Sequence, residues 1–228
     1  MRVIIQCAAS KDSKAGSFFW KGKRVKFVAQ PKKIPESKSF MYCRPDDLIR
    51  FEERTWRDML VEYNNLGSNP YGFLTAGNLY RHPTYRMLAQ QYGLNRLYIL
   101  SAGWGLVRAS FLLPDYNITF APVKPSERWK KRGKKDYYKD FNHLADDLKG
   151  QNTSKALFLG GKGYLPLLRT LLENVPCQTI IFYRIQPGRP SSKEPIHPFP
   201  SATFVPFPTA SCTNWHYECA KALVAGNI

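Results

Sequence analysis

The sequence lacks several features that would place it in a familiar class of protein. None of its apolar runs reaches the length of a membrane span, and no basic amphipathic helix that would bind a membrane surface stands out. Its five cysteines are scattered and never spaced C-x-x-C, so neither a disulfide framework nor a structural zinc site is expected. The four histidines are also dispersed, and we predict no metal and no cofactor. The N-terminus, MRVIIQCAASK, lacks the long apolar region and cleavage site of a signal peptide, which favours a cytoplasmic location.

Acidic residues are scarce as well. The chain has 17 Asp and Glu residues against 34 Lys and Arg residues, which gives a formal net charge of +17. An excess of this size favours a polyanionic partner and fast, salt-sensitive association, although a basic but otherwise ordinary enzyme is the alternative. We therefore expect DNA as the partner, with no membrane and no obligate protein partner.

The residues that are abundant predict a folded α/β protein. Hydrophobic residues make up 43% of the 228 residues, which is typical of a globular chain that fits one domain. The expected strands are 2–8, 25–30, 96–101, 155–161 and 178–184. The expected helices are 46–66, 78–92, 164–175 and 214–225, with a charged helical region at 126–150. This alternation predicts a single α/β domain with a central, largely parallel sheet flanked by helices.

Small, flexible residues follow three of the expected strands. They occupy 7–11, 101–105 and 160–163. Because ligands bind at the carboxyl ends of parallel strands, we expect these loops to form one crevice. Ser10, Lys11 and Lys162 are candidates for phosphate contact through backbone N–H groups and lysine charge. The alternative is a set of tight connections, since no Walker motif is present.

The stretch ILSAGWGLVRASFLLPDYNITF, residues 99–120, resembles part of a known family. SAGWGLV followed by LPDYNITF is similar to the core motif of the YaaA-like family and its small relatives of unknown function. In that motif a strand ends in LSA and precedes x-x-GL and an acidic PYD-x-T segment. The family's C-x-x-SK and LY motifs are matched here by Cys7 to Lys11 and by Leu79-Tyr80.

The chain also departs from that family. The family's Pro-Tyr-Asp reads Asp115-Tyr116-Asn117 here, and the segment at about 17–77 looks like a basic insertion within a single domain, 1–228. Family members have been linked to DNA binding and oxidative stress. The arrangement also resembles a phage-defence branch of DNA glycosylases that remove modified bases. More loosely, it resembles the uracil glycosylases, in which an Asp lies beside a Tyr in the water-activating loop.

Cleavage of an N-glycosidic bond in DNA has chemical needs that this stretch meets. The enzyme extrudes a nucleotide, holds its base between aromatic faces, reads the base edge and directs water at the sugar with a carboxylate. The predicted catalytic residues are Asp115, Tyr116 and Asn117, and the predicted base-binding residues are Trp104, Ser101 and Gly103. The alternatives are a turn residue after Pro114 for Asp115, and core packing for the two aromatic rings.

The segment RWKKRGKKDYYKD, residues 128–140, is a basic patch interleaved with aromatic residues. Such patches bind nucleic-acid backbones, and the alternative is a solvated helix face. Because residues 128–135 carry six positive charges and no acid, we predict DNA contact. With Ser10, Lys11 and Lys162, the predicted DNA-binding residues are Arg128, Lys130, Lys131, Arg132, Lys134 and Lys135.

The sequence thus predicts a DNA glycosylase that removes a modified or damaged base and leaves an abasic site, with antiviral defence as its setting. The alternative is a non-enzymatic DNA-binding stress-response protein of the YaaA type. A nucleotide-processing transferase is a third class, which the charge disfavours because a free nucleotide does not need so basic a protein.

Overall fold

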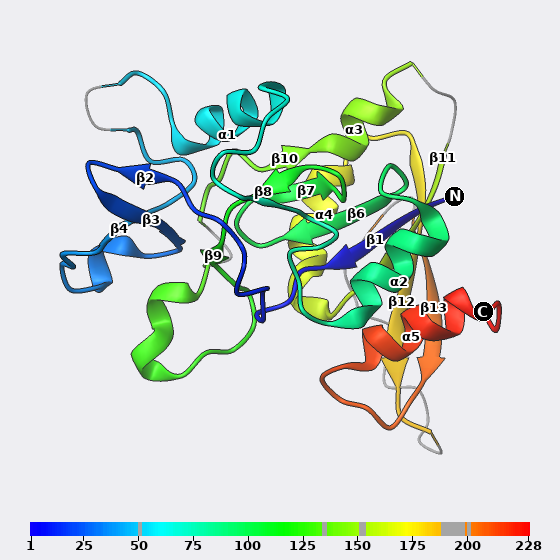
Figure 1. Cartoon of the computed structure of the whole chain (residues 1–228). Coiled ribbons are helices and arrows are strands. Elements are labelled where there is room, and N and C mark those ends of the chain that lie inside the picture. The colour runs from blue at the N-terminus through cyan, green and yellow to red at the C-terminus, as the bar shows by residue number, and fades with distance from the viewer. Residues whose placement is uncertain (50–51, 134–135, 151–153, 188–198, 200–201) are drawn as a thin grey trace.

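A seven-stranded sheet forms the centre of the molecule, in the order β10-β7-β6-β1-β11-β12-β13 (Figure 1). The computed structural model describes residues 1–49, 52–133, 136–150, 154–187, 199 and 202–228. The strands of the sheet are β1 (Arg2–Gln6), β6 (Leu97–Ser101), β7 (Gly105–Arg108), β10 (Phe141–Asn142), β11 (Ser154–Leu159), β12 (Cys177–Ile185) and β13 (Ala202–Pro208). All neighbouring strands are parallel except β6 and β7, so the predicted largely parallel sheet is confirmed.

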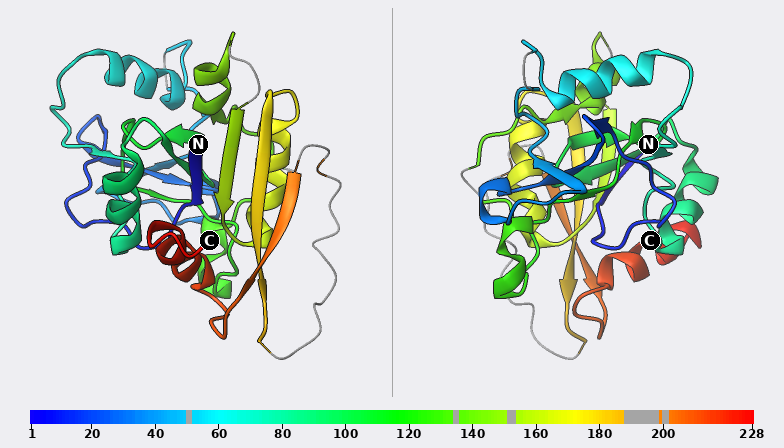
Figure 2. Two further views of the ribbon diagram at one scale, coloured as in Figure 1. Left: turned by 90° about the vertical axis from the view of Figure 1, so that its right-hand side faces the viewer. Right: turned by 60° about the vertical axis from the view of Figure 1, so that its left-hand side comes forward.

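Helices cover both faces of this sheet. α2 (Pro83–Tyr92) and α5 (Trp215–Val224) pack on each other on one face, and α4 (Leu165–Leu172) lies on the opposite face (Figure 2). The short α3 (His143–Leu148) packs against β7. Every residue of β6 is buried, as expected for a strand that is covered on both sides. The predicted α/β fold is therefore confirmed.

A second, small sheet is built largely from the segment that looked like an insertion. It contains β2 (Phe19–Trp20), β3 (Lys23–Val28) and β4 (Phe40–Cys43), and β9 (Tyr116–Asn117) pairs with β3. β5 (Leu74–Thr75) pairs with β8 (Leu112–Leu113), and α1 (Trp56–Asn65) follows β4. One continuous core includes buried residues of both sheets. The 99–120 stretch therefore ties the small sheet to the central one.

Three element predictions are wrong in their bounds or type. The helix expected over 46–66 begins only at Trp56, because Thr55 and Asp58 form a capping box there. The helix expected over 78–92 begins at Pro83, which suits a first helical position. The region 126–150 is no long helix: it contains the 3₁₀ helix η2 (Pro125–Lys130) and, after the undescribed residues 134–135, α3.

The strand β13 was not expected, since it lies in a proline-rich part of the sequence. It is the edge strand of the sheet, and an edge tolerates proline because one row of its backbone groups needs no partner. Two further 3₁₀ turns, η1 (Pro31–Lys33) and η3 (Lys162–Tyr164), complete the elements of the described chain. In that part of the chain, no helix has the length and apolar character needed to cross a membrane.

Candidate functional site

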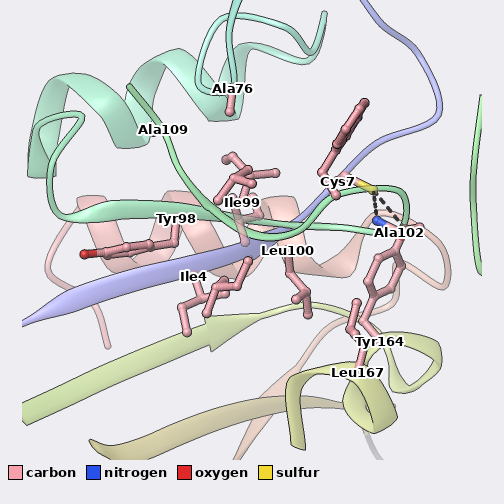
Figure 3. Close-up of a cluster of buried hydrophobic side chains, with 14 of the residues drawn as sticks. Ile4, Cys7, Ala76, Tyr98, Ile99, Leu100, Ala102, Ala109, Tyr164 and Leu167 are labelled. Atoms are coloured by element: carbon pink, nitrogen blue, oxygen red, sulfur yellow. Dashed lines mark hydrogen bonds between the residues drawn. The ribbon is translucent and has the colours of Figure 1, made fainter. Parts of the chain in front are cut away.

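The loops after β1, β6 and β11 meet at one edge of the central sheet, as the sequence predicts. The three strands are adjacent and parallel, so their carboxyl ends coincide. The Ala102 backbone N–H points at the Cys7 thiol, with N and Sγ 3.5 Å apart, and Cys7 Sγ lies 3.1 Å from Tyr164 Oη (Figure 3). The Gly161 N–H donates to Gln6 Oε1 over 2.7 Å. These contacts bring the three loops together as predicted, but residues 7–11 and 101–105 are not among those that line the cleft at this edge.

A cleft of about 860 Å³ opens at this edge, beside the ends of β1, β11 and β12. Its volume suits a nucleotide-sized ligand. Side chains that line it include Gln6, Phe120, Lys162, Tyr164, Arg184 and His216.

The orientation of Gln6 in this cleft is fixed by two contacts. Because Gln6 Oε1 accepts from Gly161 N–H, its Nε2 faces His216 Nε2 at 3.3 Å. Burial lowers the pKa of His216 to about 4, helped by the nearby His82, so the ring is neutral at physiological pH and accepts this hydrogen bond. Gln6 and His216 thus form a preset polar wall of the cleft.

A buried cluster of hydroxyl groups lies behind the loops. Tyr116 Oη lies 2.7 Å from Tyr80 Oη and accepts from Ser101 Oγ over 2.9 Å. Burial raises the pKa of both tyrosines well above the usual value, so both are neutral. The Tyr116 ring is consequently held in one place and in one protonation state.

Lys11 reaches across that ring. Its Nζ lies 3.9 Å from the centroid of the Tyr116 ring, and the side chain is half-buried. No described residue forms a hydrogen bond or salt bridge with its ammonium group. Burial lowers the pKa of Lys11, Cys7 and Asp115 oppose this effect, and the positive charge of Lys130 adds a smaller lowering.

Asp115 is the acidic partner within electrostatic reach of Lys11. It is half-buried and lies between β8 and β9 rather than in a turn, with its backbone N–H donating to Gly16 O over 2.8 Å. Its carboxylate makes no hydrogen bond or salt bridge with any described residue. The turn interpretation of Asp115 is therefore not supported.

The three residues predicted to be catalytic do not face one point. Tyr116 and Asn117 are successive residues of β9, and successive side chains of a strand point to opposite faces. The buried Tyr116 turns towards Tyr80, whereas the half-buried Asn117 turns away from it. Tyr116 therefore supports Lys11, and it does not present a face to an extruded base.

The residues predicted to bind the base are internal. Trp104 is fully buried, with its ring centroid 5.0 Å from that of Phe27 and 6.3 Å from that of Phe141. Ser101 Oγ donates a hydrogen bond to Tyr116 Oη. A Cβ on Gly103 would lie 3.2 Å from the Tyr116 ring, so the glycine allows this close packing. Core packing explains all three, so the base-binding prediction is corrected: none of these residues lines the cleft.

The basic patch divides into structural and exposed members. Arg132 is buried and forms two hydrogen bonds with Asp140, of 2.9 and 2.6 Å, and a third of 2.9 Å to Ala102 O. Lys130 forms a salt bridge with Glu127. Arg132 is therefore no free phosphate ligand, and its predicted DNA contact is corrected.

Of the other predicted DNA-binding residues, Lys11 is half-buried as described above, four are exposed and two lie outside the described chain. The exposed ones are Ser10, Arg128, Lys131 and Lys162. Lys134 and Lys135 lie outside the described residues. The Thr119 N–H donates to Lys130 O over 2.9 Å, and Lys130 is within electrostatic reach of Lys11, so this basic segment borders the site.

Sequence reasoning missed the polar wall of the cleft. Gln6 ends β1, and His216 lies on α5, far away in the sequence. Tyr164, which connects the cleft to Cys7, follows the Gly-rich run and was expected only to begin a helix. That glycine run was a signal for the cleft, and His216 could be considered from the sequence only as a lone histidine, a residue that usually serves structure.

Neither a scan against protein-family models nor a search of curated proteins found a match for this chain. The resemblance to the YaaA-like family therefore stays a prediction. The function has to be argued from the chemistry of the site.

Proposed function

We propose that the protein is a DNA glycosylase, which hydrolyses the N-glycosidic bond of a modified or damaged base and leaves an abasic site. The observation that carries this proposal is that Lys11 Nζ lies over the ring of Tyr116, the residue after Asp115, with the charges of Lys11 and Asp115 within electrostatic reach of each other. Both charged residues are half-buried, and neither is hydrogen-bonded to a described residue. A purely structural buried pair is normally satisfied by hydrogen bonds, so this arrangement favours a ligand site.

The chemistry assigned to Asp115 follows from its charge. Departure of a base leaves positive charge on the sugar, and a carboxylate stabilises that charge and orients the attacking water. In this proposal the cleft of about 860 Å³ holds the extruded base. Phe120 offers it an aromatic face, and Gln6 and Arg184 offer polar groups.

DNA is the proposed partner because of the charge distribution. The chain carries +17, and Arg128, Lys131 and Lys162 are exposed on segments that border the cleft or the Lys11 site. Phosphate neutralisation by such residues would supply sequence-independent affinity, while the cleft would supply selectivity for the base. The cytoplasmic location and the role in antiviral defence belong to this proposal as well.

The test is an abasic-site assay on a panel of genomic DNAs that carry different base modifications. The proposal expects the wild-type protein to create abasic sites in at least one of them. The net charge of +17 supports the alternative, a non-enzymatic DNA-binding protein, equally well. Tight binding to every DNA with no base released from any would favour that alternative and overturn the glycosylase.

A further inference from the structure

Arg184 and the glycine-rich loop 160–163 lie at the same end of the central sheet. β11 ends at Leu159, whereas its parallel neighbour β12 continues to Ile185, so the end of β12 passes along the loop that follows β11. Gln6, the last residue of β1, lies on the other side of that loop. Arg184, Gln6 and the four loop residues all line the cleft of about 860 Å³.

The guanidinium group of Arg184 has a buried donor without a partner. Its Nε is buried and forms no hydrogen bond with a described residue. Its Nη2 lies 3.4 Å from Ala210 O, a long distance for a hydrogen bond. A guanidinium stays charged in proteins and has five N–H donors, so most of this capacity is unused. Leaving a buried donor unpaired is unfavourable, and such groups indicate a site that a ligand completes.

The other polar groups near Arg184 in the cleft are also donors. The Gly161 N–H already occupies Gln6 Oε1, so Gln6 has only its Nε2 to offer, and one N–H of that amide faces His216. The N–H groups of Lys162 and Gly163 open the 3₁₀ helix η3, which continues into α4, and the first N–H groups of a helix have no partner within it. Lys162 adds an exposed ammonium group. Among the described residues that line the cleft there is no Asp or Glu.

A cleft that offers cations and N–H donors but no carboxylate selects an anionic ligand. Phosphate fits these groups because arginine binds its oxygens through two parallel N–H bonds, and the start of a helix binds them through backbone N–H groups. Phe120 and Trp215 line the same cleft and offer aromatic faces to a base. The volume of about 860 Å³ lies within the range of ~300–1,000 Å³ that ligand sites occupy, so phosphate and base have room together.

We propose that the cleft contains a phosphate subsite, formed by Arg184, Lys162 and the N–H groups of the loop 160–163, so that its ligand is a nucleotide and not a bare base. The subsite follows from the groups of the cleft. That the nucleotide belongs to a DNA strand rests on the proposed function.

The experiment is calorimetric titration of the full chain with deoxynucleosides, with their 5′-monophosphates and with inorganic phosphate. We expect the wild type to bind the monophosphates at least about tenfold more tightly than the nucleosides, and inorganic phosphate to compete with them. Arg184→Gln should weaken monophosphate binding by about 10–100-fold, the effect of losing a charge-assisted hydrogen bond, and leave nucleoside binding unchanged. Arg169→Gln removes the same charge from an exposed position of α4 outside the cleft, and it should have no such effect.

Two results would overturn the subsite. One is equal affinity of the wild type for nucleosides and monophosphates, a comparison that holds even if Arg184→Gln fails to fold. The other is equal weakening by Arg184→Gln and Arg169→Gln, because the affinity would then come from the net charge of the protein. Lys162→Gln, a change at an exposed residue, is a second variant that should weaken monophosphate binding selectively.

A short single-stranded oligonucleotide distinguishes a DNA strand from a free nucleotide as the source of the phosphate. Displacement of a bound monophosphate by the oligonucleotide would support DNA, and failure to displace it would contradict DNA and assign the subsite to a free nucleotide. The abasic-site assay separates this inference from the proposed function. Selective phosphate binding without base release from any DNA would support the subsite and overturn the glycosylase. Base release by a protein with no preference for monophosphates would do the reverse.

Discussion

Replacing Arg132 with Gln distinguishes a residue that holds the site together from one that contacts DNA. The side chains of Arg132 and Asp140 are only 5% and 7% exposed, and two hydrogen bonds join them. Removing one partner of a buried ion pair leaves the other charge uncompensated, which costs about 3–5 kcal/mol. We expect Arg132→Gln to lower the free energy of unfolding by that amount, a large part of the ~5–15 kcal/mol that stabilises a typical domain.

The destabilisation should depend on pH in a definite direction. Burial already raises the pKa of the Asp140 carboxyl with Arg132 in place, and loss of the cation raises it further. A carboxyl whose folded-state pKa is raised binds its proton more tightly in the folded state. The deficit of Arg132→Gln relative to the wild type is therefore largest above the folded-state pKa of Asp140 in the variant, and it shrinks as the pH falls towards the lower folded-state pKa of Asp140 in the wild type.

The assay is urea unfolding followed by tryptophan fluorescence at several pH values, with DNA affinity measured in parallel. Lys131→Gln is the matched control for stability, because Lys131 is the exposed neighbour of Arg132. The free energy of unfolding of Lys131→Gln should lie within about 0.5 kcal/mol of the wild-type value. A stable Arg132→Gln protein with weakened, less salt-dependent DNA binding would refute this reasoning and return Arg132 to the DNA-binding residues.

Three further predictions concern packing and charge. Trp104→Ala should lower the free energy of unfolding by about 3–5 kcal/mol. The DNA affinity of the folded fraction should stay unchanged. A selective loss of affinity for modified DNA would instead place the indole in the base site. Tyr116→Phe should cost about 1–3 kcal/mol in urea unfolding, because its two buried hydroxyl partners lose a hydrogen bond; wild-type stability would show that this network contributes nothing. Changing Arg128, Lys131 and Lys162 to Gln should make the log–log salt dependence of DNA binding shallower by about one unit per lost phosphate contact, and an unchanged slope would remove these residues from the interface.

The central strands and their meeting loops could be predicted from the sequence because their signals are local. β1, β6 and β11 are apolar runs that end in small residues, and parallel neighbours bring such ends together. The edge strand β13 could not be predicted from the sequence, because proline is disfavoured in a strand. Only its position at the edge of the sheet, which the sequence does not reveal, makes the prolines acceptable. The sequence offers two possible starts for α1: Pro45 with the acids Asp46 and Asp47, and the capping box of Thr55 with Asp58. The helix begins at the second of them.

The roles of individual side chains were harder to predict, since burial depends on partners that are distant in sequence. Trp104 is covered by Phe27 of the small sheet and by Phe141 of the central one. Lys131 and Arg132 look alike in the sequence, and only the position of Asp140 makes one of them internal. Composition indicates that a surface is basic, but it does not identify which cations remain free.

The most direct test of the central claim is the rate of base release by wild type and Asp115→Asn on the same modified DNA. Asn keeps the shape and removes the charge, and no described residue hydrogen-bonds the Asp115 carboxylate, so folding should hardly change. Glu53→Gln, which neutralises an exposed carboxylate elsewhere, serves as the control. We expect near-normal DNA affinity and unfolding for Asp115→Asn, with base release slower by roughly 10²–10⁴-fold. Release at the wild-type rate by folded Asp115→Asn would contradict the account.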